Sequence, residues 1–267
     1  MLQQEILPLL RTYLPSNVAP KRLRYRVFGF GESNLQQILT ESFPDWPDEI
    51  ELGFRATMPL LELKLKVDYS EHHVLLSQWD TKIKSLLGDH IVTEDARPLA
   101  QVVIDLLTAQ NKTITLAESC TGGKIASMIT EISGASSVFE AGFVSYSNAI
   151  KHQLLEVSEA DLLRDGAVSQ VVVEQMLLGA LRKSGANYGV SVSGIAGPGG
   201  GSDEKPVGTV WLAWGCESKM HSRQFYFPGN RVFFQQIVAA LALDLIRREL
   251  IASDQQPVYF MNRQKKA

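Results

Sequence analysis

A serine between a predicted strand and a predicted helix is the first candidate for chemistry in this sequence. Ser119 lies in the segment AESCTGG, which follows a short apolar stretch. Backbone N–H groups converge where a strand passes into a helix, and Gly122 and Gly123 let a ligand approach that backbone closely. Such a place serves a nucleophile and an oxyanion together. Two alternatives stay open: Ser119 or Thr121 only caps the helix, or Cys120 is the nucleophile.

A serine needs a base to lose its proton, and the best candidate in the sequence is Lys151. It ends the segment FVSYSNAIK, which also contains Tyr146 and Asn148. A lysine buried among apolar groups has a lowered pKa and acts as a general base, and Tyr146 would relay a proton or orient the lysine. The alternative is a solvated lysine on the first turn of a helix. Histidines offer no better base, since only His152 is near this segment and its context is polar.

A glycine-dense loop and an arginine are the remaining candidates. The segment SVSGIAGPGGGSDEKPVGT contains Ser193, Gly194, Gly197 and Lys205. Glycine-rich loops at strand ends cradle phosphate through backbone N–H groups, although this spacing is neither a P-loop nor a dinucleotide fingerprint. A plain flexible lid is the alternative. The segment PGNR places Arg231 at the start of the last predicted helix, where the positive end of the helix dipole also favours anions.

An α/β domain with a mixed sheet must position these residues. Strands and helices alternate over residues 96–252, and the last two strands are expected to pair antiparallel. Ser169 and Asn230 are expected to cap the helices that follow them. The predicted strands are 112–118, 139–147, 188–193, 207–215 and 220–227; the predicted helices are 97–110, 122–132, 149–155, 159–163, 169–183 and 230–251.

A smaller α+β module is expected before this domain. Residues 1–20 resemble an amphipathic helix and a linker, and residues 21–92 follow the order β-α-β-β-α. The strands are predicted at 21–30, 50–55 and 60–68, and the helices at 33–43, with Ser33 as the cap, and at 69–87. Residues 253–267 are expected to form a polar, frayed tail.

Taken together, the segments AESCTGG, FVSYSNAIK, VSGIAGPGGGSDEKPVGTVW and PGNR resemble the C-terminal domain of the CinA family, the nicotinamide-nucleotide amidases also called PncC. The resemblance covers about residues 96–252. Residues 21–90 look like the small KH-like module that precedes this domain in longer CinA proteins. The first domain of those proteins has no counterpart in this sequence, so the resemblance implies no ADP-ribose pyrophosphatase activity here.

The resemblance implies hydrolysis of nicotinamide mononucleotide to nicotinic acid mononucleotide and ammonia, without a metal or other cofactor. The family's nucleophile matches Ser119, its tyrosine and lysine match Tyr146 and Lys151, and an assisting hydroxyl, often threonine, matches Ser193. The basic residue of the last helix matches Arg231. The residues expected to bind substrate are Thr121, Gly122, Gly123, Asn148, Gly194, Gly197, Lys205 and Arg231. A homodimer is the family-based expectation.

Composition limits the other classes of function. The net charge is −3 and the isoelectric point about 6.0, so no basic excess indicates a nucleic-acid partner. The predicted KH-like segment also lacks a GxxG loop between helices. No apolar stretch is long enough to span a membrane, and no signal peptide is recognisable, so a cytoplasmic protein is expected. Two alternatives stay open: a catalytically silent nucleotide-binding or competence-related module, and an amidase for another amide.

Overall fold

The computed structural model describes residues 5–6 and 18–262, and the chain divides into two compact units. The first unit is Met1–Ala96 and the second is Arg97–Ala267. Most of the helix and linker predicted over residues 1–20 lies outside the described residues. None of the helices in the described part is long and apolar enough to cross a membrane.

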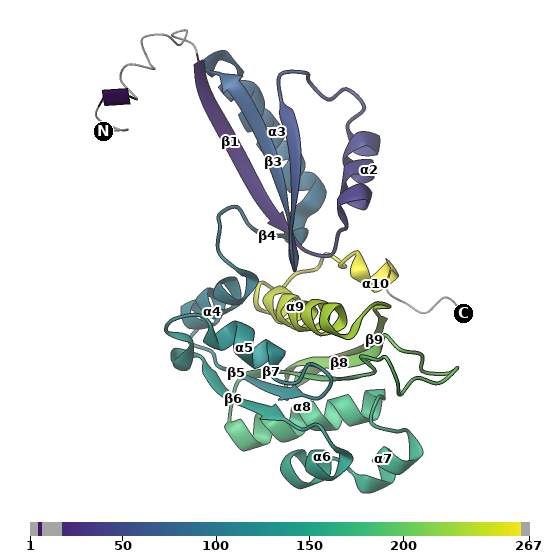
Figure 1. Ribbon diagram of the computed structural model, residues 1–267. Helices are drawn as coiled ribbons and strands as arrows, with labels where there is room; N and C mark the ends of the chain where they lie inside the picture. The colour runs from purple at the N-terminus through teal and green to yellow at the C-terminus, as the bar shows by residue number, and fades with distance from the viewer. Residues whose placement is uncertain (1–4, 7–17, 263–267) are drawn as a thin grey trace. The chain divides into compact units, whose positions relative to one another are not determined.

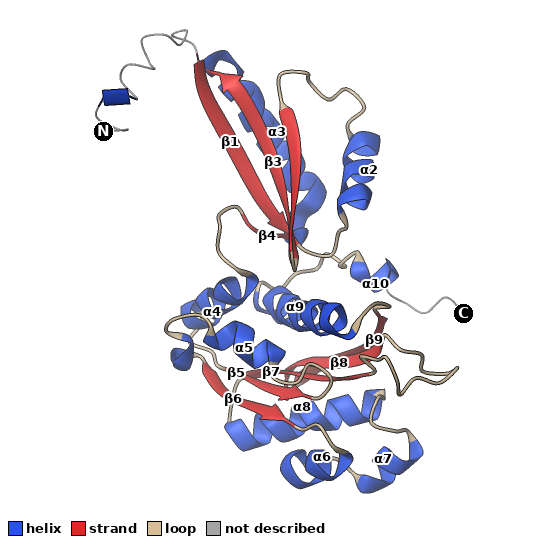
Figure 2. Cartoon of the chain, in the orientation of Figure 1, coloured by secondary structure: helices blue, strands red, loops and turns tan. Residues whose placement is uncertain are grey.

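The first unit is an antiparallel sheet covered by two helices (Figures 1 and 2). Its strands are β1 (Val18–Val27), β2 (Glu51–Thr57), β3 (Leu60–Tyr69) and β4 (Ile91–Thr93), in the spatial order β2-β3-β1-β4. Its helices are α2 (Glu32–Ser42) and α3 (His73–Leu87). The sequence missed β4, because three residues are too few to show an alternating pattern. Gly31 caps α2, so the prediction that Ser33 caps it is wrong.

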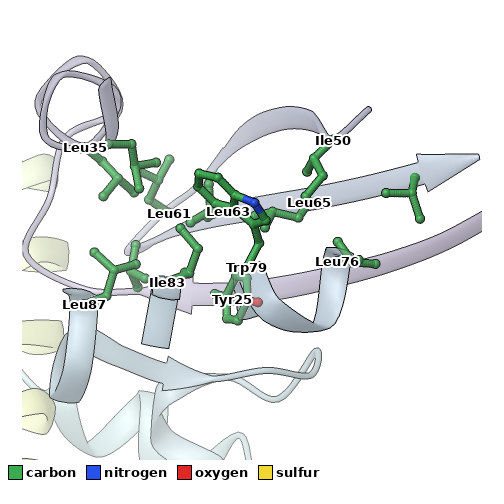
Figure 3. Close-up of a cluster of buried hydrophobic side chains, with 13 residues drawn as sticks. Tyr25, Leu35, Ile50, Leu61, Leu63, Leu65, Leu76, Trp79, Ile83 and Leu87 are labelled. Carbon is green, nitrogen blue, oxygen red and sulfur yellow. The ribbon is translucent and has the colours of Figure 1, made fainter. Parts of the chain in front are cut away.

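The alternation of apolar and charged residues along β1 and β3 decides which face of this sheet the helices cover. Successive residues of a strand point to opposite faces, so every second residue belongs to the core. Tyr25 pairs with Leu63, and both are fully buried against helix residues such as Trp79 and Ile83. Figure 3 shows these side chains gathered on the helix side of the sheet. The charged residues between them therefore point away from the core.

The second unit is a mixed five-stranded sheet in the order β6-β5-β7-β8-β9, as the predicted fold class requires. β5 pairs parallel with β6 and β7, while β8 pairs antiparallel with β7 and β9. The strands are β5 (Ile114–Glu118), β6 (Phe139–Val144), β7 (Tyr188–Gly194), β8 (Thr209–Cys216) and β9 (Lys219–Tyr226).

Helices cover both faces of this sheet (Figure 1). One face carries α4 (Leu99–Ala109), α5 (Lys124–Thr130) and α9 (Arg231–Leu250), and the other carries α6 (Asn148–Leu155), α7 (Glu159–Arg164) and α8 (Gln170–Ser184). Asn230 caps α9 as predicted, since its side chain accepts the N–H of Phe233.

Two local predictions in this unit differ from the structure. Ser169 occupies the N-cap position of α8, but its hydroxyl donates to the Gly166 carbonyl and caps nothing. The expected frayed tail is wrong for residues 253–262. Tyr259, in the short helix α10 (Tyr259–Asn262), is buried and donates its hydroxyl to Asp244. The segment is polar apart from a few residues that include Tyr259 and Phe260, both of which pack against the second unit, so its composition did not predict this packing.

Candidate active site

The parallel strands β5, β6 and β7 bring the candidate residues to one edge of the sheet. The carboxyl ends of parallel strands meet at the same edge, so the residues after them become neighbours. Ser119 follows β5 directly, and its N–H donates to the carbonyl of Val192 in β7. Ser145, which follows β6, donates its N–H to the carbonyl of Glu118. Segments separated by about 70 residues in the chain thus converge on Ser119.

Glu118 fixes the turn that carries the nucleophile. Its side chain is fully buried, and its two carboxylate oxygens accept the N–H groups of Gly123, Ile125 and Ala126 at 2.9–3.2 Å. These bonds satisfy donors that the first turn of α5 would otherwise leave unpaired. Glu118 was not predicted from the sequence, although an acidic residue before a helix is a recognisable signal.

Lys151 lies buried beside the proposed nucleophile. Its side chain comes from the second turn of α6, its exposed fraction is 1%, and its Nζ lies 2.8 Å from Ser119 Oγ. Burial lowers the pKa of Lys151 from 10.5 to about 8. Among the described residues, no carboxylate forms an ion pair with this lysine. The lysine is therefore buried without a countercharge, and the alternative of a solvated surface lysine does not hold.

The hydrogen bonds of Lys151 determine the direction of the lone pair on its neutral amine. Nζ donates to the carbonyl oxygens of Ser145 and Tyr146, at 2.8 and 3.2 Å. A neutral amine has two N–H donors and one lone pair. Because the two carbonyls take the two donors, the lone pair of the neutral amine faces Ser119 Oγ. As an ammonium, Nζ donates to Ser119 Oγ; as a neutral amine it accepts the Ser119 proton across the same contact, as a general base must.

Tyr146 contributes to the site through its backbone and, separately, through its phenol. Its carbonyl accepts from Lys151, whereas its hydroxyl accepts from Arg231 Nη2 at 3.0 Å. Arg231 also donates from Nη1 to the carbonyl of Gly197 at 3.1 Å. The arginine at the start of α9 thus joins the segment after β6 to the glycine loop. The orienting role expected for Tyr146 belongs to its carbonyl in this arrangement.

Ser193 and Gly194 lie at the end of β7, beside Ser119 in the sheet. Ser191 points toward α8, because its hydroxyl donates to the Val173 carbonyl, and alternation puts Ser193 on the same face. Ser193 is buried, but within the described part of the chain no hydrogen bond joins it to Ser119 or Lys151. A Cβ at Gly194 would lie 2.8 Å from Val210, so glycine is required there for packing.

Asn148 and Lys205, two of the expected substrate-binding residues, form no hydrogen bond with any other candidate site residue in the described structure. Asn148 begins α6 and is exposed. Lys205 donates from Nζ to the Asp165 carbonyl at 2.6 Å, and so ties the glycine loop to the segment before α8. Its backbone N–H donates to Ser202. Lys205 therefore has a structural partner of its own.

In the turn after Ser119, some backbone N–H groups already have acceptors and others do not. Gly122 and Gly123 have φ values of +62° and +93°, which favour glycine. The Gly122 N–H donates to Ser119 O and the Gly123 N–H to Glu118. Within the described residues, the N–H groups of Cys120 and Thr121 donate to no other residue. The two donors nearest to the nucleophile are thus available to an oxyanion.

Cys120 is a poor rival nucleophile in this environment. Its exposed fraction is 4%, and burial raises the pKa of its thiol to about 12. A thiol at neutral pH is far less nucleophilic than its thiolate. The carbonyl of Cys120 accepts from Gln235 Nε2 at 2.9 Å. Gln235, one turn after Arg231 on α9, was not predicted from the sequence, although a spacing of four residues puts it on the same helix face.

Known proteins resemble both the second unit and most of the whole chain. Residues 96–250 match the family model of the CinA C-terminal domain. A CinA-like protein of Colwellia psychrerythraea is 47% identical over 251 residues, covering 93% of this chain and 58% of that protein. A CinA-like protein of Akkermansia muciniphila is 38% identical and covers 91% of this chain and 58% of its own length. The chain thus spans less than two thirds of these relatives.

Solved structures match more than half of this chain in fold as well as in sequence. The crystal structure of the competence/damage inducible protein CihA from Agrobacterium tumefaciens is 40% identical, with a TM-score of 0.55. It covers 60% of this chain and 99% of that one. A CinA superfamily protein from Klebsiella pneumoniae is 29% identical, with a TM-score of 0.56 over 58% of this chain and 99% of that one.

Proposed function

The chain belongs to the CinA family, and from its site we propose that it hydrolyses the carboxamide of nicotinamide mononucleotide to nicotinic acid mononucleotide and ammonia. One observation carries the proposal: Lys151, buried and without a carboxylate partner, lies 2.8 Å from Ser119 Oγ. Burying a lysine in this way destabilises the fold, because its ammonium loses hydration without gaining a countercharge. A binding module has no use for such a base beside a hydroxyl, so this observation favours the enzyme over the silent module.

Acylation is the first of two chemical steps. Neutral Lys151 takes the proton of Ser119 as Oγ attacks the carboxamide carbon, which forms a C–O bond and a tetrahedral oxyanion. The N–H groups of Cys120 and Thr121 are the donors we assign to that oxyanion. This assignment replaces the N–H groups near Gly122 and Gly123 expected from the sequence, because those two already donate within the turn.

Collapse of the oxyanion breaks the C–N bond, and protonated Lys151 returns its proton to the leaving nitrogen. Ammonia departs and leaves the nicotinate moiety esterified to Ser119. A water molecule then gives its proton to Lys151 and attacks the ester carbonyl. Cleavage of the ester bond restores Ser119 with the proton held by Lys151. The sum of both steps is amide plus water giving acid plus ammonia, and the enzyme ends as it began.

Arg231 is the side chain we assign to the substrate phosphate. Its exposed guanidinium lies against the glycine loop through its bond to Gly197 O, and the planar donors of a guanidinium match phosphate oxygens. Its current partners, Gly197 O and Tyr146 Oη, are uncharged acceptors that a phosphate would displace with a gain in electrostatic energy. Lys205 remains a second candidate for this contact once it leaves the Asp165 carbonyl.

The direct test is ammonia release from three amides: nicotinamide mononucleotide, the corresponding dinucleotide and free nicotinamide. The wild-type chain is expected to act on the mononucleotide. Ser119→Ala and Lys151→Met are each expected to lose roughly 10³-fold or more, as when one member of a catalytic unit is removed. Near wild-type release by either variant contradicts the mechanism. If the chain prefers another of the three amides, the proposed mechanism stands but the proposed substrate is wrong.

A further inference from the structure

The first unit segregates its charges onto one face of its sheet. Residues 18–96 contain nine lysines and arginines against thirteen aspartates and glutamates, so the segment as a whole is acidic. Six of the nine cations nevertheless lie on the side of β1, β2 and β3 that the helices leave uncovered. We call this side the basic face. It consists of Arg22, Arg24 and Arg26 of β1, Glu62, Lys64 and Lys66 of β3, and Glu51, Gly53 and Arg55 of β2.

Strand register arranges these nine residues as a three-by-three grid. Arg22 pairs with Lys66 and Lys66 with Glu51, while Arg26 pairs with Glu62 and Glu62 with Arg55. The middle row is Arg24, Lys64 and Gly53. Residues two apart in a strand are separated by about 6.8 Å and adjacent strands by about 4.8 Å, so the grid measures roughly 14 by 10 Å.

The anions at this face are already paired, and most of its arginines are not. Lys66 lies 2.9 Å from Glu51 and 3.1 Å from Asp68, and Lys64 lies 2.8 Å from Glu62. Contact with Lys64, reinforced by the charges of Arg24 and Arg26, holds the pKa of Glu62 below its usual range. Three cations, Arg24, Arg26 and Lys64, thus surround the single carboxylate of Glu62.

Three exposed arginines on the grid are free to bind a ligand. Arg22, Arg24 and Arg55 form no ion pair or hydrogen bond within the described residues. Arg26 approaches Glu62 only to 3.9 Å. Guanidinium groups bind phosphate in a bidentate manner and are more weakly hydrated than ammonium groups. Four arginines without close partners on a flat surface thus match a ligand that carries several phosphates in a row.

From this grid we infer that the basic face binds single-stranded nucleic acid through its phosphate backbone. None of the nine residues is apolar or aromatic apart from glycine, so the face lacks the anchors of a protein interface and the platforms that stack bases. Binding is therefore indifferent to base sequence. Single-stranded nucleic acid is flexible enough to follow the face across β1, β3 and β2. A duplex is a stiff rod that meets a flat face along one line.

The glycine of the grid leaves room for the strand. A Cβ at Gly53 would have only the Cβ of Lys64 within 4 Å, at 3.9 Å, so the space above the centre of β2 is open. The expectation of no nucleic-acid partner rested on the net charge of −3. A net charge sums over the whole chain and does not show that basic residues gather on one face. The inference concerns the first unit and does not depend on the proposed amidase activity.

Salt dependence tests the inference with the full chain and a labelled 20-nucleotide single-stranded DNA of mixed sequence, measured by fluorescence anisotropy. Four arginine–phosphate contacts predict a slope of about −3 in log affinity against log salt, which is a loss of roughly 50-fold between 50 and 200 mM. In Arg22→Gln/Arg24→Gln the slope is expected to fall to about −1.4, with weaker binding at 50 mM.

A matched control removes the same charge elsewhere. In Lys82→Gln/Lys112→Gln two lysines outside the basic face are neutralised, and this variant is expected to bind like the wild type. The melting temperature of each variant reports whether it folds. The inference is overturned if the wild type does not bind at 50 mM salt, or if the control weakens as much as the arginine variant. It is also overturned if a duplex of equal length binds as tightly, or if polyglutamate competes as well as the oligonucleotide, which would indicate an acidic protein partner.

Discussion

The protonation of Lys151 makes a quantitative prediction about the pH dependence of the proposed reaction. Only the neutral amine can accept the Ser119 proton, so activity must follow the deprotonated fraction of Lys151. With a pKa of about 8, roughly one-tenth of the enzyme is in this form at pH 7. With the ordinary pKa of 10.5, the fraction would be about one in 3,000. Burial therefore raises the concentration of active base roughly 300-fold at pH 7, equivalent to about 3 kcal/mol.

The assay is the initial rate of ammonia release from nicotinamide mononucleotide between pH 6 and 10. Because the folded-state pKa is lowered, kcat/KM is expected to rise about tenfold for each pH unit below 8 and to level off above it. Lys151→Arg is the control, since a guanidinium stays protonated and should be inactive throughout. A flat profile would show that deprotonation of Lys151 does not control the rate. An ascending limb near pH 6.5 would equally exclude Lys151, because it would indicate a histidine as the base.

Three further substitutions test separate parts of the site. Cys120→Ala should keep activity within a few-fold, because burial holds the thiol protonated; loss of ammonia release in this variant alone would make the thiol the nucleophile. Glu118→Gln should lower kcat about 10- to 100-fold with little change in KM, since its amide cannot accept three N–H groups from the turn; an unchanged kcat would show that the turn does not depend on it. Arg231→Gln should raise KM about 10- to 100-fold, and Tyr146→Phe much less, when initial rates are measured over a range of substrate concentrations; equal effects would mean that the link between them matters rather than the positive charge.

The elements with strong periodicity could be predicted from the sequence. Strand β3 alternates Leu61, Leu63 and Leu65 with charged residues, and that pattern alone decides its two faces. Short or irregular elements could not be predicted, as β4 shows, since three residues gain their strand geometry only by pairing with β1. Pairing partners, unlike local patterns, depend on the whole fold.

The residue types at the site were accessible from the sequence, but their contacts were not. Ser119 and Lys151 stand 32 positions apart, and only the parallel pairing of β5 and β6 brings the ends of their segments together. Burial of Lys151 also depends on packing between α6 and α8, which no local pattern encodes. The sequence therefore offered two open interpretations of this lysine, and tertiary structure decided between them.

The choice of backbone donors for the oxyanion also depends on tertiary contacts. Glycines near a nucleophile indicate close approach of a ligand, and the sequence accordingly favoured the N–H groups near Gly122 and Gly123. Which N–H groups remain free depends on the acceptors nearby, and here the Glu118 carboxylate takes that of Gly123. The role of Glu118 was visible in principle, since a carboxylate before a helix commonly binds its first N–H groups.

Trapping the covalent intermediate shows directly whether Ser119 is the nucleophile. Wild-type protein mixed with nicotinamide mononucleotide and quenched in acid within the first turnovers should contain a fraction heavier by the mass of the substrate less ammonia. Peptide mapping should place this adduct on Ser119, and Ser119→Ala should never form it. An adduct on Cys120 would contradict the account. Ammonia release with no adduct on any residue, under conditions in which hydrolysis of the ester is slow, would equally contradict it.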